Sequence, residues 1–201
     1  FEGNGTISSW YGDNANINAR LNNPYKEGSN ISNTVLEYKD VGGQYANIRF
    51  DVDENFDLSD NYTFTLKIYV PAVGITGSQN NQVSLKLQNN SLNEPWTTQT
   101  EVIKSIELNQ WQTVTFNFKD DTYSNFDPNS QPPINRNDFN RVVLQVNGEN
   151  NTDRVTAYFD DFLYDGTIAN DNDEPVFDNL VWSDEFDEGS GSVTDLADTK
   201  W

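Results

Sequence analysis

Three segments of the chain carry mostly polar or charged side chains at every second position, with Val143 as the exception, and apolar side chains at the positions between. The segments are residues 45–51, 82–88 and 141–147. Because successive side chains of a β-strand point to opposite faces, one face of each segment is expected to join a core and the other to meet solvent. The candidate ligand-binding residues are the outward ones and one aromatic residue of a following loop: Tyr45, Asn47, Arg49, Lys86, Gln88, Trp96, Arg141, Gln145 and Asn147.

These residue types could bind a sugar. A pyranose ring has an apolar C–H face that stacks on an aromatic ring, and hydroxyl groups that pair with amides and charged side chains. If the three segments are neighbours in one sheet, their outward side chains line a groove with Trp96 as a wall. Pro95 precedes Trp96 and restricts the backbone, which suits the presentation of a rigid ring. The alternative is an ordinary polar sheet face whose cations balance nearby carboxylates.

The acidic residues do not show the pattern that glycan hydrolysis requires. Retaining hydrolysis needs two carboxyl groups about 5 Å apart, and residues on one face of a strand recur at every second position. Asp160 and Asp161 are adjacent and therefore point to opposite faces, while Asp51, Asp53 and Glu54 lack a third partner at the right step. Without Cys or His, the chain has no thiol nucleophile, Ser-His pair or imidazole zinc site. We expect a non-catalytic chain.

The composition is strongly acidic, with 32 Asp and Glu against 12 Lys and Arg and a formal net charge of −20. This charge repels nucleic acids and anionic membrane surfaces, so neither is expected as a partner. No apolar run approaches the length of a membrane span, so insertion into a membrane is not expected either. The 201 residues suffice for one β-sandwich with a core and for a short tail.

Strand-like alternation recurs through residues 1–166, and no segment there shows a convincing helical period. Further examples are residues 63–70 and 111–118, and clusters of Asn, Asp, Gly, Ser and Pro such as 120–137 separate the strands. Many short strands with this punctuation predict an all-β fold, an antiparallel β-sandwich of the jelly-roll type. Residues 167–175, TIANDNDEP, are interpreted as a short acidic linker to the tail.

Several sequence pieces carry a resemblance that covers nearly all of residues 1–166. They are FEGNGT, GQYAN, TFTLKIYVP, VSLKLQN, WQTVTFNF and YFDDF, in this order. Their order resembles that of β-jelly-roll carbohydrate-binding modules found beside glycan-degrading domains in Bacteroidota. The resemblance implies a polysaccharide partner and a secreted or cell-surface location. The chain departs from the pattern at Tyr45, where relatives often carry Trp, so the stacking platform is expected to be smaller or to lie elsewhere.

The same resemblance implies a structural Ca²⁺ ion. In such modules a carboxylate near the N-terminus and one on the last strand share the ion, and Ca²⁺ takes several oxygen ligands at 2.3–2.6 Å. The expected ligands are Glu2 and Asp160, with Asp161 as the substitute if a bulge shifts the register. The alternative is that the two aspartates are simply solvated on an edge strand.

The tail resembles a different family. Trp182, Ser183, Asp184, Glu185, Phe186 and Trp201 occur in the order and spacing of the N-terminal signature of family-16 glycoside hydrolases, closest to the laminarinase-like branch that cuts β-1,3-glucans. Residues 176–201 are therefore expected to be the truncated start of such a catalytic domain, without its catalytic signature of two Glu flanking an Asp. The alternative is a poorly ordered acidic linker end.

Together, these observations predict a non-catalytic carbohydrate-binding module, residues 1–166, joined by the linker 167–175 to a family-16 hydrolase. The expected ligand is a β-glucan, specifically laminarin, and the expected role is to hold the hydrolase on its polysaccharide. Arg49, Lys86 and Arg141 would also suit an anionic algal polysaccharide, which is the alternative ligand. The alternative role is that of a structural or protein-interaction spacer.

Overall fold

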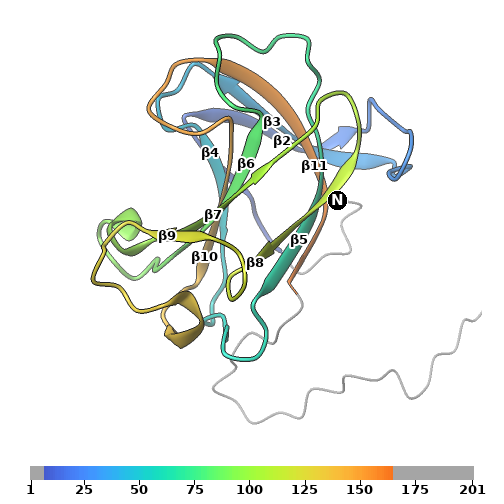
Figure 1. Cartoon of the computed structure of the whole chain (residues 1–201). Coiled ribbons are helices and arrows are strands. Elements are labelled where there is room, and N and C mark those ends of the chain that lie inside the picture. Colours follow the sequence, from blue (N-terminus) through green and yellow to red (C-terminus); the bar gives the residue numbers. More distant parts are fainter. Residues whose placement is uncertain (1–6, 165–201) are drawn as a thin grey trace, which may run out of the picture. The chain divides into compact units, whose positions relative to one another are not determined.

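A computed structural model describes residues 7–164, which form two antiparallel β-sheets packed face to face (Figure 1). Glu2, the linker 167–175 and the tail 176–201 lie outside the described residues. In spatial order, the first sheet contains β1 (Tyr11–Asp13), β4 (Asn47–Asp51), β10 (Arg141–Val146), β6 (Gln82–Gln88), β7 (Thr100–Ser105) and β9 (Tyr123–Asn125). The second contains β2 (Ala15–Asn22), β3 (Thr34–Val41), β11 (Arg154–Tyr164), β5 (Thr63–Tyr69) and β8 (Gln112–Asn117).

This architecture confirms the predicted fold class, an all-β antiparallel sandwich. Two short 3-10 helices, η1 (Pro95–Thr98) and η2 (Pro133–Asn135), interrupt the loops of the described region. Within residues 7–164, no helix has the length and apolar character needed to cross a membrane.

The core lies between the two sheets and follows the alternation of the sequence. In β4, Ile48 and Phe50 are buried, and in β5 Phe64, Leu66 and Ile68 are buried, while the residues between them are partly exposed. Burial of apolar side chains from both sheets supplies the main stabilisation of such a sandwich. The opposite face of the first sheet is left free to carry polar side chains.

The three segments predicted to be neighbours lie side by side in the first sheet. Strand β10 pairs with β4 on one side, where Val143 faces Arg49, and with β6 on the other side, where Val143 faces Lys86. Strand β7 then pairs with β6, with Glu101 opposite Lys86. This register aligns the outward residues of four strands into rows that run across the sheet.

Strand β11 contains an irregularity that places the two adjacent aspartates. Its pairing with β5 shifts between Asp160 and Leu163, and Asp161 has a φ of 46°, in the left-handed region. An irregularity of this kind re-aims the side chains on either side of it. Asp160, the last residue in regular register, is buried against Asn30, whereas Asp161 is exposed beside Lys67.

Candidate functional site

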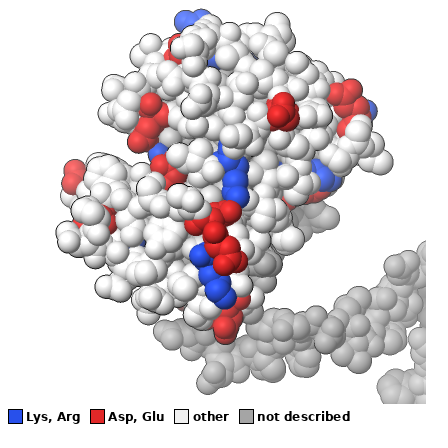
Figure 2. Space-filling view, in the orientation of Figure 1, with Lys and Arg blue, Asp and Glu red and all other residues white. Residues whose placement is uncertain are grey.

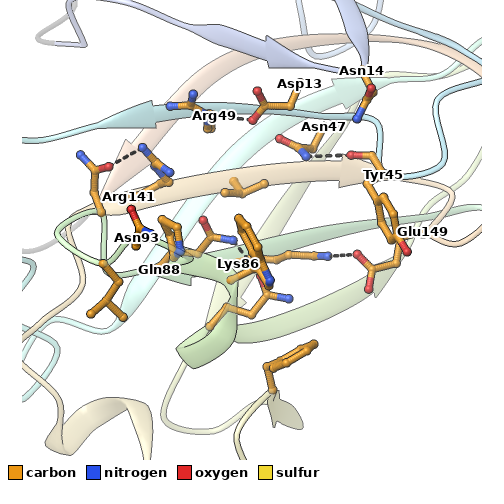
Figure 3. A pocket seen from close by; sticks show the side chains of 17 residues that line it. Asp13, Asn14, Tyr45, Asn47, Arg49, Lys86, Gln88, Asn93, Arg141 and Glu149 are labelled. Carbon is orange, nitrogen blue, oxygen red and sulfur yellow. Dashed lines mark hydrogen bonds and ion pairs between the residues drawn. The ribbon is translucent and has the colours of Figure 1, made fainter.

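The outer face of the first sheet carries a groove with a volume of about 870 Å³ (Figure 3). Its floor comes from β4, β6 and β10, and its walls come from the loop between β3 and β4 and from the loops after β1, β6, β9 and β10. The residues that line it are Asp13, Asn14, Tyr45, Asn47, Arg49, Lys86, Gln88, Asn90, Leu92, Asn93, Pro95, Trp96, Gln99, Phe126, Arg141, Val143 and Glu149.

The outer face of this sheet is built of rows of cross-strand neighbours, and only some members of each row line the groove. The first row contains Asp51, Arg141, Gln88 and Gln99; the second row contains Arg49, Val143, Lys86 and Glu101; the third row contains Asn47, Gln145 and Ser84. In the first row, Gln88 donates a 2.7 Å hydrogen bond from Nε2 to Oε1 of Gln99. This bond fixes two buried amides at the centre of the groove, beside the strand that carries Arg141.

Three aromatic side chains line the groove and are about half exposed. Tyr45 and Trp96 were predicted from the sequence and are 47% and 49% exposed, while Phe126 was not predicted and is 61% exposed. A partly exposed ring can stack on the apolar face of a sugar. The sequence signal for Phe126 is weak, because it consists of one large aromatic residue in a long polar loop.

Trp96 is held by a short, well-bonded turn. It lies in η1, where Pro95 is buried and the amide N–H groups of Thr97 and Gln99 donate to the carbonyl oxygens of Glu94 and Trp96. The backbone N–H of Phe126 in turn donates to the carbonyl oxygen of Gln99 at 2.9 Å. The turn and the β9 loop are therefore tied together, so that Trp96 and Phe126 belong to the same wall of the groove.

Arg49 and Arg141 are both neutralised by carboxylates. Arg49 Nε lies 2.8 Å from Oδ2 of Asp13, and its Nη1 lies 3.6 Å from Oδ2 of Asp51. Arg141 forms a two-pronged pair with Asp51, with distances of 2.5 Å and 3.0 Å, and also donates to the side chain of Asn90. A forked guanidinium-carboxylate pair fixes the orientation of both groups.

Lys86 is also paired, and it is almost completely buried. Its side chain is 4% exposed, and its ammonium nitrogen lies 2.7 Å from Oε2 of Glu149 and 3.6 Å from Oε1 of Glu101. Each of the three cations of the groove therefore has a carboxylate partner, and positive and negative atoms also adjoin one another on the face seen in Figure 2. The groove offers hydrogen bonds and rings rather than unpaired positive charge.

Two of the predicted binding residues do not reach the groove wall. Gln145 and Asn147 are 2% and 4% exposed and are not among the lining residues. Gln145 has the expected outward parity, but its Nε2 donates to the carbonyl oxygen of Ala46. Asn147 follows β10 with a φ of 61°, which takes it out of the strand alternation. The expectation that both residues are exposed in the groove is therefore corrected.

The three predicted calcium ligands are placed very differently. Asp160 is fully buried, and its carboxylate accepts hydrogen bonds from Nδ2 of Asn30 at 2.8 Å and from the amide of Asp161 at 3.0 Å. Asp161 is exposed and pairs with Lys67 at 2.7 Å. Across residues 7–164, no three acidic, His or Cys side chains group together as a metal site would require. The predicted site also includes Glu2, which lies outside the described residues, so the calcium site stays a prediction.

Comparisons with known proteins relate the chain to carbohydrate-binding modules by fold. No family model and no curated protein matches the sequence. A family 11 carbohydrate-binding module from Clostridium thermocellum, solved in complex with a β-1,3-1,4-mixed-linked tetrasaccharide, superposes with a TM-score of 0.55 at 12% identity, over 85% of this chain and 95% of that one. The family 11 module of the cellulosomal cellulase Lic26A-Cel5E of the same organism gives a TM-score of 0.52 at 12% identity, with the same coverage.

An exo-β-agarase also contains a similar domain. It matches with a TM-score of 0.52 at 10% identity, over 84% of this chain but only 25% of the agarase chain. The chain thus spans about a quarter of that enzyme's length. At these identities the comparisons show a shared β-sandwich fold.

Proposed function

We propose that the chain is a non-catalytic carbohydrate-binding module that takes a neutral β-glucan, with laminarin as the expected ligand, in the groove of the first sheet. The observation that carries the proposal is the groove itself, in which Tyr45, Trp96 and Phe126 surround a floor of amides and paired charges. Such a site offers rings to the apolar faces of sugars and hydrogen-bonding groups to their hydroxyls. The likeness in fold to carbohydrate-binding modules supports the same proposal.

The charges of the groove favour a neutral ligand over the anionic alternative. Arg49, Lys86 and Arg141 are balanced by four carboxylates, those of Asp13, Asp51, Glu101 and Glu149. An anionic polymer would have to displace these carboxylates and also approach a chain of net charge −20. Neutral hydroxyls can bind to the paired groups without breaking them.

The role of the module in a longer protein is part of the proposal. Targeting of a family-16 hydrolase, a secreted or cell-surface location and a structural Ca²⁺ ion all follow from the resemblances of the sequence. Attachment would raise the concentration of polysaccharide near the enzyme without adding any contact to its active site. The buried carboxylate of Asp160 supports the calcium proposal, with Glu2 as its expected partner.

Affinity electrophoresis of the 201-residue chain tests the proposal. The gels contain laminarin, mixed-linkage glucan, agarose, alginate or carrageenan, and a protein of similar size and charge serves as the migration reference. We expect retardation by laminarin, no retardation by alginate or carrageenan, and no release of reducing sugar from any of them. Absence of retardation in every gel would contradict the binding function and favour the spacer alternative.

A further inference from the structure

The polar face of the first sheet continues past the wall of the groove into the third row. Gln145 faces Ser84 across the pairing of β10 with β6, and the register of β10 with β4 brings Asn47 to its other side. Asn47 lines the groove, but Ser84 and Gln145 are 3% and 2% exposed and lie beyond its wall. Polar side chains of three neighbouring strands therefore lie next to the groove, and those of Ser84 and Gln145 are buried.

Each residue of the third row has a buried oxygen atom that lacks a hydrogen-bond partner among the described residues. The atoms are Oδ1 of Asn47, Oγ of Ser84 and Oε1 of Gln145. An unpaired buried polar group destabilises the folded state, and native proteins contain few of them. Three such oxygen atoms in one row place this destabilisation at a single point of the structure. A ligand that bound there and donated hydrogen bonds to them would remove it.

The ion pair of Lys86 with Glu149 lies at the end of the groove next to the third row. Lys86 lies two residues beyond Ser84 on the same face of β6, and Glu149 follows the far end of β10. To reach Glu149, the Lys86 side chain extends along the strand across the third row, toward the end of the groove where Tyr45 lies (Figure 3). Glu101 of β7, which is paired with Lys86 across the strands, lies 3.6 Å from the same ammonium group and provides a second carboxylate partner.

We infer that the third row is a further subsite of the groove, which binds hydroxyl groups of a neutral sugar when Lys86 moves from Glu149 to Glu101. The inference rests on the proposed function and extends the same groove. The ammonium group keeps a carboxylate partner throughout the movement, so no buried charge is left unpaired. The movement uncovers Ser84 and Gln145 beside Asn47, which already lines the groove.

The unpartnered atoms define the chemistry of the occupant. Oδ1 of Asn47 and Oε1 of Gln145 only accept hydrogen bonds, and the hydroxyl of Ser84 both accepts and donates. The occupant must therefore supply donors, which sugar hydroxyls do. A metal cation fits less well, because none of the three residues is a carboxylate and a buried ammonium group lies beside them.

The first test is the variant Ser84→Ala, titrated by calorimetry with laminari-oligosaccharides from the disaccharide to the hexasaccharide. We expect about fivefold weaker binding of the longer oligosaccharides, which corresponds to one lost hydrogen bond, and unchanged binding of those too short to reach the third row. The Tm is expected to stay the same or rise, because the variant removes an unpaired buried hydroxyl. The matched control is Ser78→Ala, in the exposed loop between β5 and β6, which should bind every length like the original chain.

A second pair of variants tests the movement of Lys86. Glu149→Gln weakens the closed position and should tighten binding of the longer oligosaccharides, whereas Glu101→Gln removes the open position and should weaken it. A loss of affinity in both variants would overturn the movement. Equal affinity of Ser84→Ala and the original chain at every length would overturn the subsite while leaving the proposed function intact. If the original chain bound no oligosaccharide at all, the proposed function would fall together with the subsite.

Discussion

Arg136 donates a 2.6 Å hydrogen bond from Nη1 to the carbonyl oxygen of Thr98, the last residue of the turn that carries Trp96. The guanidinium group of Arg136 also lies 3.9 Å from the ring centroid of Phe139 and forms a forked pair with Asp138. Arg136 is thus fixed by a ring and a carboxylate while it holds the turn. It is a positioning residue for Trp96, because it does not line the groove.

Replacement of Arg136 should weaken glycan binding indirectly. In Arg136→Ala the carbonyl of Thr98 loses its donor and the turn loosens, so we expect about fivefold weaker binding together with a lower Tm. Arg136→Lys keeps the positive charge but not the forked geometry. Its affinity and its Tm should therefore lie between those of the original chain and those of Arg136→Ala. Calorimetric titration with laminarin and thermal unfolding measure both effects. Unchanged affinity with a lowered Tm would show that the turn keeps its shape without Arg136.

Removal of the Trp96 ring should weaken binding directly. A stacked ring contributes about 1 kcal/mol, so Trp96→Ala should bind laminarin about fivefold more weakly with nearly unchanged Tm, since the ring is half exposed. Ile31→Ala removes an 80% exposed apolar side chain that does not line the groove, and serves as the control. Equal losses in the two variants would indicate a general surface effect instead of stacking.

Asp51 should set the preference for neutral ligands. It pairs with both Arg141 and Arg49, so Asp51→Asn leaves two guanidinium groups short of negative charge. We expect the variant to be retarded in gels that contain carrageenan, and the retardation to disappear at high salt, because salt screens exposed charges. Asp120→Asn makes the same change of charge outside the groove and should not be retarded. If carrageenan does not retard Asp51→Asn, charge pairing is not the source of the selectivity for neutral ligands.

A fall in pH should weaken the ion pair between Asp138 and Arg136. Burial opposes ionisation of Asp138, but hydrogen bonds from Arg136 and Asn89 and the charge of Arg136 hold the pKa of Asp138 below its usual value. The carboxylate of the folded chain therefore contributes stability above the unfolded pKa of about 3.9, and this stability is lost as the pH falls through the lower folded pKa. Since water screens this partly exposed pair, the contribution is about 0.5 kcal/mol.

Thermal unfolding between pH 6 and pH 2.5 measures this contribution. Asp138→Asn should have a lower Tm than the original chain at pH 6, and the difference should shrink as the pH falls, because protonation removes the charge of Asp138. A constant difference across the range would mean that the carboxylate charge is not the source of the stabilisation.

The predicted calcium ion can be tested through Asp160. We expect EDTA to lower the Tm of the original chain and to leave the Tm of Asp160→Asn unchanged, because the variant lacks the proposed carboxylate ligand. Asp161→Asn is the matched control, since Asp161 is exposed and paired with Lys67, and it should keep its response to EDTA. A Tm of the original chain that does not respond to EDTA would contradict the calcium prediction.

Alternation in the sequence was sufficient to predict the strands that build the floor of the groove, because a strand with one buried face has a period of two. That these strands share one sheet was expected from the usual jelly-roll order, and β2, β3 and β7 were not predicted. Alternation placed Arg49, Lys86 and Arg141 on one face, where the structure also has them. Strand bounds were less accurate: β4 begins at Asn47 and β10 ends at Val146, so Tyr45 and Asn147 lie just outside strands.

The partners of these side chains could not be predicted in the same way. Lys86 and Glu149 are 63 residues apart, and Arg49 and Asp13 are 36 apart. Such pairs depend on where loops return to the sheet, and local periodicity carries no information about this. The burial of Gln145 could not be predicted either, because its Nε2 donates to the carbonyl oxygen of Ala46, 99 residues away in the sequence.

The first sheet ends on both sides in strands of only three residues, β1 and β9. A sheet edge exposes unpaired backbone groups that can recruit a strand from another molecule, and a short edge offers few of them. Chains bound to one polymer, as the proposed function implies, would meet at a high local concentration. If the chain binds a polysaccharide as proposed, the short edges of the groove-bearing sheet would limit the growth of intermolecular β-sheet between copies bound side by side.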